Sequence, residues 1–117
     1  MIAQSLAEVP EFPTWSYKTD QPMSLEAVRQ VAKKLPGGIY WCKGVVFAVE
    51  APERRVVLQV VGRRSDVSLY DEWGDSQPLT QIVAIGAPGG IDGEDLTAKL
   101  DACRAFYVLI KVETSYP

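Results

Sequence analysis

The residues best suited to chemistry in this chain are basic and aromatic side chains between positions 41 and 73. Trp and Arg are common anchors of protein–protein contacts, because each joins a large contact area to polar donors. The pattern therefore predicts recognition of another protein, and the predicted contact surface consists of Trp41, Lys43, Arg63, Arg64 and Trp73. The alternative is a solvated sheet face on which the arginines pair with Asp66 or Glu50.

The sequence contains few residues that are suited to catalysis. Histidine is absent, which removes the commonest general base at neutral pH and the commonest metal ligand. The two cysteines, Cys42 and Cys103, lie far apart and form no C-x-x-C pair, so we expect reduced, half-buried thiols. We predict no catalytic residue, no cofactor and no metal site, and hence not an enzyme.

Two further segments have some features of ligand sites. The glycine-rich run Gly86–Gly90 precedes a predicted helix but lacks the lysine and hydroxyl of a phosphate loop. Acidic residues at the start of that helix would repel a phosphate, which favours a plain turn. Asp71, Glu72 and Asp75 surround Trp73 without the spacing of a calcium loop, which favours a solvated acidic loop.

Charge and hydropathy exclude two classes of partner. The net charge is −3, whereas nucleic-acid binding depends on neutralising phosphates with Lys and Arg. No apolar run approaches the ~20 residues of a membrane span, and the N-terminus lacks the features of a signal peptide. We therefore predict a cytoplasmic protein with a flexible arm at residues 1–11 and one domain at residues 12–117. A homo-oligomer is left open, as is whether the chain is a natural stand-alone protein.

The order of predicted elements is β-α-β-β-β-α-β. The pattern predicts strands at 12–18, 39–50, 55–62, 80–86 and 106–113, with residues 67–70 either extending the third strand or forming a short extra one. Ser24 and Asp92 precede the two predicted helices as N-caps, and Pro36-Gly37-Gly38 ends the first helix. Strands grouped between helices predict an α+β fold: a two-layer sandwich with a mainly antiparallel sheet of four to five strands and both helices on one face.

This sheet must position the candidate residues. Neighbouring strand residues alternate between faces, so Trp41 and Lys43 should project together and Cys42 should point to the opposite face. Gly44, in the same strand, predicts a bulge or a close approach of another backbone. If the helices leave one face uncovered, Trp41, Lys43 and Arg63 would line it.

The same segments resemble the C-terminal domain of the CobW-type metallochaperone GTPases over about residues 12–103. The resemblance is carried, in the order found in that family, by LPGGIY at 35–40, Lys43-Gly44, APERR at 51–55, LQVVGRR at 58–64, Trp73-Gly74, IVAIG at 82–86, Ile91-Asp92 and Asp101 to Cys103. Trp41 departs from the family pattern, in which a basic residue is expected two places before the lysine.

The resemblance implies an accessory role. In that family a P-loop GTPase domain delivers zinc or cobalt, and the C-terminal domain is non-catalytic. The resemblance thus implies a stand-alone interaction module that acts with a separate GTPase or a metalloprotein client. The alternative is a sensor domain that binds a small molecule or metal between sheet and helices or at a dimer interface.

Overall fold

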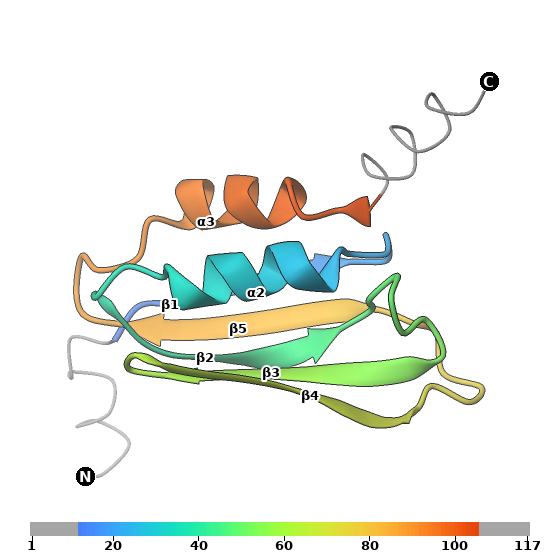
Figure 1. Ribbon diagram of the computed structural model, residues 1–117. Helices are drawn as coiled ribbons and strands as arrows, with labels where there is room; N and C mark the ends of the chain where they lie inside the picture. The colour runs from blue at the N-terminus through green and yellow to red at the C-terminus, as the bar shows by residue number, and fades with distance from the viewer. Residues whose placement is uncertain (1–11, 106–117) are drawn as a thin grey trace, which may run out of the picture.

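The computed structural model describes residues 12–105, in which two helices lie on one face of a five-stranded sheet (Figure 1). Every pair of neighbouring strands is antiparallel, and the strand order across the sheet is β1-β5-β2-β3-β4. The predicted two-layer α+β architecture is therefore confirmed. Along the chain the elements are β1 (Thr14–Thr19), α2 (Leu25–Lys33), β2 (Ile39–Val46), β3 (Arg54–Val61), β4 (Arg64–Glu72), β5 (Thr80–Gly86) and α3 (Gly93–Asp101).

The observed order of the described elements is β-α-β-β-β-β-α, which confirms the extra strand that the sequence left open, and two boundaries differ from the prediction. Residues 64–72 form a separate strand, β4, antiparallel to β3, so that Asp71 and Glu72 belong to a strand and not to a loop. The strand predicted at 39–50 ends at Val46. The predicted final strand at 106–113 and the predicted arm at 1–11 lie outside the described residues.

Both helices begin at the predicted caps. The Ser24 side chain accepts a hydrogen bond from the Ala27 N–H at 3.3 Å, and the Asp92 carboxylate accepts one from the Asp95 N–H at 3.1 Å. These contacts satisfy N–H groups that have no partner within the helix. Val28 and Ala32 of α2 and Leu96 and Leu100 of α3 then face the sheet and are buried, in accordance with the helical period.

The core lies between the helices and the inner face of the sheet. Alternate residues of β3 and β5 are buried there, because successive strand side chains point to opposite faces. In β3 these are Val56, Leu58 and Val60, as the sequence pattern predicts. Alternate side chains of these strands therefore point toward the helices and form the core, whereas the remaining side chains point to the opposite face of the sheet.

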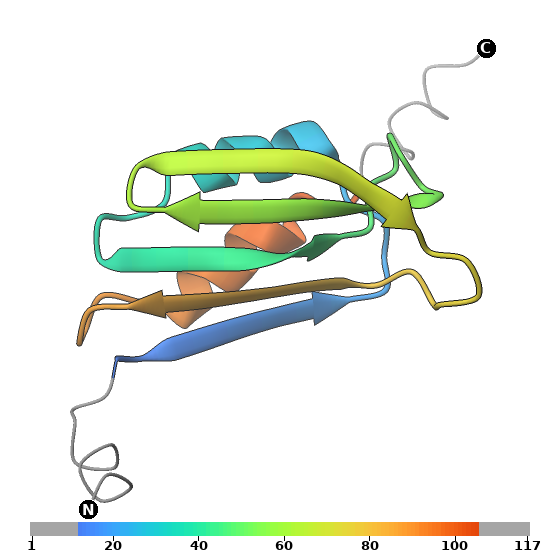
Figure 2. The ribbon, with the colours of Figure 1, turned by 90° about the horizontal axis from the view of Figure 1, so that it is seen from below.

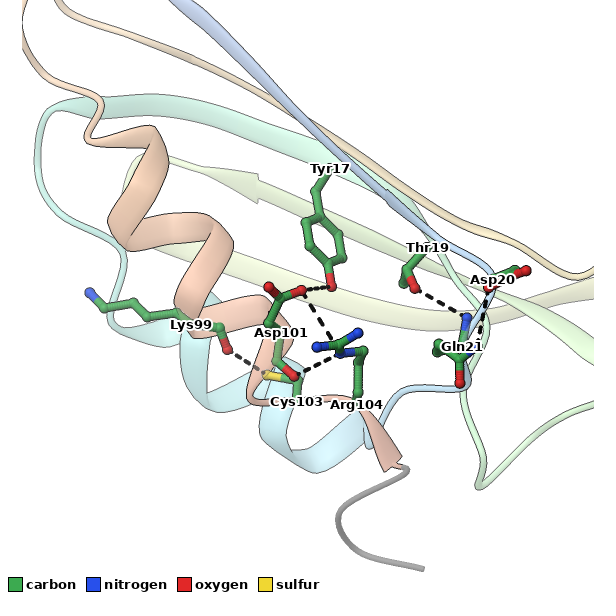
Figure 3. Close-up of polar contacts among 8 residues, drawn as sticks. All are labelled: Tyr17, Thr19, Asp20, Gln21, Lys99, Asp101, Cys103 and Arg104. Carbon is green, nitrogen blue, oxygen red and sulfur yellow. Dashed lines mark hydrogen bonds and ion pairs between the residues drawn. The ribbon is translucent and has the colours of Figure 1, made fainter.

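The C-terminal end of α3 is fastened to the edge strand β1 (Figure 3). The Tyr17 hydroxyl donates a hydrogen bond of 2.8 Å to the Asp101 carboxylate, and Arg104 Nε lies 3.9 Å from the same carboxylate. About one turn earlier in α3, the Thr97 hydroxyl accepts a hydrogen bond of 3.2 Å from the Trp15 indole N–H. These contacts hold α3 over β1 and β5, whereas α2 lies nearer β3 and β4 (Figures 1 and 2).

Candidate functional site

The face of the sheet opposite the helices carries the candidate site. Figure 2 views this face directly, and no described helix covers it. Trp41 of β2 pairs with Ile85 of β5 on one side and with Val61 of β3 on the other. Directly paired residues lie on the same face, so these three side chains form an apolar stripe across the three central strands. We call this uncovered surface the open face.

The next row of the open face is mainly polar but contains one exposed valine. Lys43 pairs with Gln59 of β3 and with Val83 of β5. The Lys43 ammonium lies 5.9 Å from the centroid of the Trp41 ring, close enough for a cation–π contact. Val61, in the Trp41 stripe, is 54% exposed, and Val83, in the Lys43 row, is 41% exposed. Both rows therefore expose apolar surface to solvent. The predicted projection of Trp41 and Lys43 to one side is confirmed.

The two arginines of the predicted surface occupy different places. Arg64 begins β4 and pairs with Val61, which extends the Trp41 row to the sheet edge. Arg63 lies in the two-residue turn between β3 and β4 and lines a groove beside the end of α2. The structure thus keeps Trp41, Lys43 and Arg64 together and places Arg63 at a second surface.

Trp73 lies apart from both surfaces and is only 7% exposed. Its ring packs edge-to-face on Phe47, with centroids 6.2 Å apart, and the Arg55 guanidinium covers it at 5.0 Å. Arg55 is held there by an ion pair with Asp71 at 3.0 Å. Trp73 therefore serves as a packing residue at the far end of β2 and β3 from Trp41, and we leave it out of the candidate site.

The glycine-rich run before α3 forms a turn that packs on another loop. The Ala87 N–H donates a hydrogen bond of 2.8 Å to the Gly38 carbonyl, and the Gly90 N–H donates one of 2.7 Å to the Ala87 carbonyl. Two N–H groups that a phosphate would need are thus already used within the protein. The Asp92 carboxylate also occupies the start of α3, as described above.

The environments of three described side chains, Cys42, Cys103 and Tyr17, favour their neutral forms. Burial raises the pKa of the Cys42 thiol and of the Cys103 thiol to about 11 each. Burial and the hydrogen bond to Asp101 likewise raise the pKa of Tyr17 above its usual range. Because the thiolate is the nucleophile and metal ligand, these environments oppose both kinds of chemistry.

This burial predicts a loss of stability in alkali. Well below pH 9 both thiols are neutral in the folded and unfolded states, whereas between about pH 9 and 11 the thiols ionise more in the unfolded chain than in the folded one. The free energy of unfolding should therefore fall as pH rises through this window, by at most about 2–3 kcal/mol per thiol. Urea unfolding at pH 8, 9.5 and 10.5 measures the fall. The double variant Cys42→Ala, Cys103→Ala should remove most of the fall between pH 8 and 9.5, where the raised pKa of Tyr17 does not yet contribute, and an equally steep fall there would contradict the assignment.

Between the helices and the sheet, which is one of the two places that the sensor alternative allows, residues 12–105 leave little room for a metabolite. A cavity of about 20 Å³ lies between the helices and the sheet, and its lining is apolar, with Val28, Cys42 and Leu96 among the residues. This volume holds about one water molecule. Within residues 12–105 no cluster of three or more candidate metal ligands occurs, and neither helix is long and apolar enough to cross a bilayer.

The fold defines a class: a two-layer α+β domain in which the two described helices cover one side of an antiparallel sheet and leave the other side uncovered. The family model for the cobalamin synthesis protein CobW C-terminal domain matches residues 12–104. The chain belongs to this family.

Solved structures show the same fold. The Zn(II)-bound YjiA GTPase from E. coli superposes with a TM-score of 0.69 at 22% sequence identity, covering 80% of this chain. A triple mutant of the Zn(II)-bound YjiA GTPase gives a TM-score of 0.70 at the same identity and coverage. In both cases the chain spans 30% of the length of the matched chain. No curated protein matches the sequence.

Proposed function

We propose that this domain is a non-catalytic interaction module of a CobW-type, GTP-dependent metallochaperone system. Its open face, centred on Trp41 and Lys43, would contact a GTPase domain or a metalloprotein client. Membership of the CobW C-terminal domain family supports a role in a CobW-type system. The observation that carries the contact surface is the apolar stripe left uncovered by the two helices.

The composition of the open face supports binding to a protein. Apolar side chains in register across neighbouring strands form a continuous patch, and such patches often mark protein contact sites. Trp41 is half-buried, and partial burial restricts a side chain before binding, which lowers the conformational entropy that it loses in a contact. Lys43 and Arg64 border the stripe with positive charge, which would steer a partner carrying acidic groups.

The non-catalytic part of the proposal rests on the protonation of the buried side chains. Cys42 points away from the open face, toward the helices, and its thiol is neutral at physiological pH. The rows of Trp41 and Lys43 on the open face present mainly apolar and basic side chains, and Asp66, opposite Gln59, is the one carboxylate in these two rows.

A binding titration with the full chain tests the proposal. The titrant is the GTPase domain of a CobW-family protein from the same organism, and the affinity is measured by calorimetry. Trp41→Ala combined with Lys43→Glu should weaken binding at least about tenfold, because truncating a central aromatic anchor commonly costs more than 1.4 kcal/mol.

The matched control is Arg29→Glu, a charge reversal at an exposed position of α2 in the other layer. It should leave the affinity within about twofold, since distant surface charges change binding little. Equal weakening by both variants, or no effect of either, would rule out the open face as the contact. Circular dichroism melts of each variant confirm that the fold is retained.

A further inference from the structure

Arg63, which the structure separates from the open face, lines a second hollow. This groove, of about 550 Å³, lies between the C-terminal end of α2 and the turn that joins β3 to β4. Its volume falls in the range of ligand-binding clefts. The groove is lined by Ala32, Lys33, Leu35, Pro36, Gly37, Ile39, Gly62 and Arg63.

The ionisable side chains that line the groove all carry positive charge. Lys33 and Arg63 are the ionisable residues of the lining, and it contains no carboxylate. Both side chains are exposed, and neither forms an ion pair within residues 12–105. Two cations without a carboxylate partner at one hollow favour an anionic ligand, because charge-assisted hydrogen bonds are among the stronger polar contacts.

The groove also has an apolar part. Ile39 is buried, Leu35 is half-buried, and Pro36 adds an exposed ring beside them. A simple inorganic anion would gain nothing from these side chains, whereas a peptide presents carboxylates and apolar side chains together. Nucleic acid is disfavoured by the net charge of −3.

Short, fixed backbone segments position both cations. Gly62 has φ of 60° in the first central position of the turn, and Val61 pairs with Arg64 across it, as in a tight hairpin. The Gly62 N–H donates a hydrogen bond of 3.2 Å to the Tyr40 carbonyl, which ties the turn to β2. On the other wall, Lys33 lies in the last turn of α2, where its charge also offsets the partial negative charge of the helix end.

We propose that this groove binds an acidic peptide segment of a partner protein. Carboxylates of the peptide would contact Lys33 and Arg63, and an apolar side chain between them would rest on Leu35 and Pro36. The site is distinct from the open face and uses none of the three residues assigned to it, so it does not depend on the function proposed above.

Fluorescence anisotropy with the full chain tests this assignment. The probe is a short labelled peptide of alternating glutamate and leucine, and the matched control peptide carries glutamine in place of every glutamate. The glutamate peptide should bind at least tenfold more tightly than the glutamine peptide. The double variant Lys33→Glu, Arg63→Glu should lose at least tenfold of that affinity. The single variants Lys33→Gln and Arg63→Gln, which add no new charge, should each lose part of it.

Lys43→Glu, on the open face, is the control for charge alone and should leave peptide affinity within twofold. No binding of the glutamate peptide, equal binding of the glutamine peptide, or unchanged affinity in the double variant would each overturn the proposal. Full displacement of the peptide by millimolar inorganic phosphate would also overturn it, in favour of a simple anion site. Tighter binding of duplex DNA than of the peptide would overturn it in favour of nucleic acid. Titration of the GTPase domain against the same variants reports on the open face separately.

Discussion

Replacement of Gly44 by alanine is expected to lower the free energy of unfolding by about 3 kcal/mol, at the upper end of the cost of overpacking a core. Gly44 lies in β2, and an added Cβ would overlap the Gln81 carbonyl oxygen and lie 2.7 Å from the Ile82 Cα of β5. These are backbone atoms of a central strand, so no side-chain rotation can relieve the contact. Urea unfolding at pH 7 measures the loss.

Gly37→Ala is the matched control for this prediction. An added Cβ at Gly37 would meet no atom within 4 Å, so the free energy of unfolding should change by no more than about 1 kcal/mol. The change can be stabilising, because alanine restricts the unfolded chain more than glycine does. If Gly44→Ala proved as mild as Gly37→Ala, the close approach of β2 and β5 would be refuted.

Truncation of Trp73 to alanine is expected to cost about 3–5 kcal/mol of stability, as for other large buried aromatics. The ring fills the space between Phe47 and the Arg55 guanidinium, and its removal would leave both without their packing partner. Trp73→Phe should cost much less. The buried indole N–H has no hydrogen-bond partner among residues 12–105, so its loss removes a polar group that gains nothing from burial there.

Trp41→Ala provides the comparison, with thermal and urea unfolding as the measurements. Trp41 lies half-exposed on the open face, and its truncation should cost no more than about 1 kcal/mol, typical of positions outside the core. The two substitutions are thus expected to have different effects: truncation of Trp73 lowers stability, and truncation of Trp41 weakens partner binding. A larger stability loss for Trp41 than for Trp73 would reverse these roles.

Local signals were enough to predict most of the fold. The helices follow from Ser24 and Asp92 as caps and from apolar residues at the helical period, both of which act within a few residues. β3 follows from strict alternation, because one of its faces is buried. β4 was ambiguous since it is an edge strand in which only Val67 packs against the core, and a strand that buries so little leaves a weak hydrophobic pattern.

The candidate site could be predicted in part. The shared direction of Trp41 and Lys43 follows from the two-residue period of a strand. The burial of Trp73 could not be deduced, since it depends on Arg55 and Phe47, which lie far from it along the chain. The groove at Arg63 could not be predicted from the sequence either. It forms where the end of α2 lies beside a hairpin turn about thirty positions later in the chain.

The strand order has a consequence for how this protein emerges from the ribosome. β2, β3 and β4 are neighbours both in sequence and in the sheet, so they can pair as soon as they are synthesised. β1 is made first, yet its partner is β5, with Thr14 opposite Ile85. The first strand must therefore wait, with Trp15 and Tyr17 unpaired, until nearly all of the described chain has been translated. We expect the N-terminal edge to be the last part of the sheet to form and the part most dependent on chaperones during synthesis.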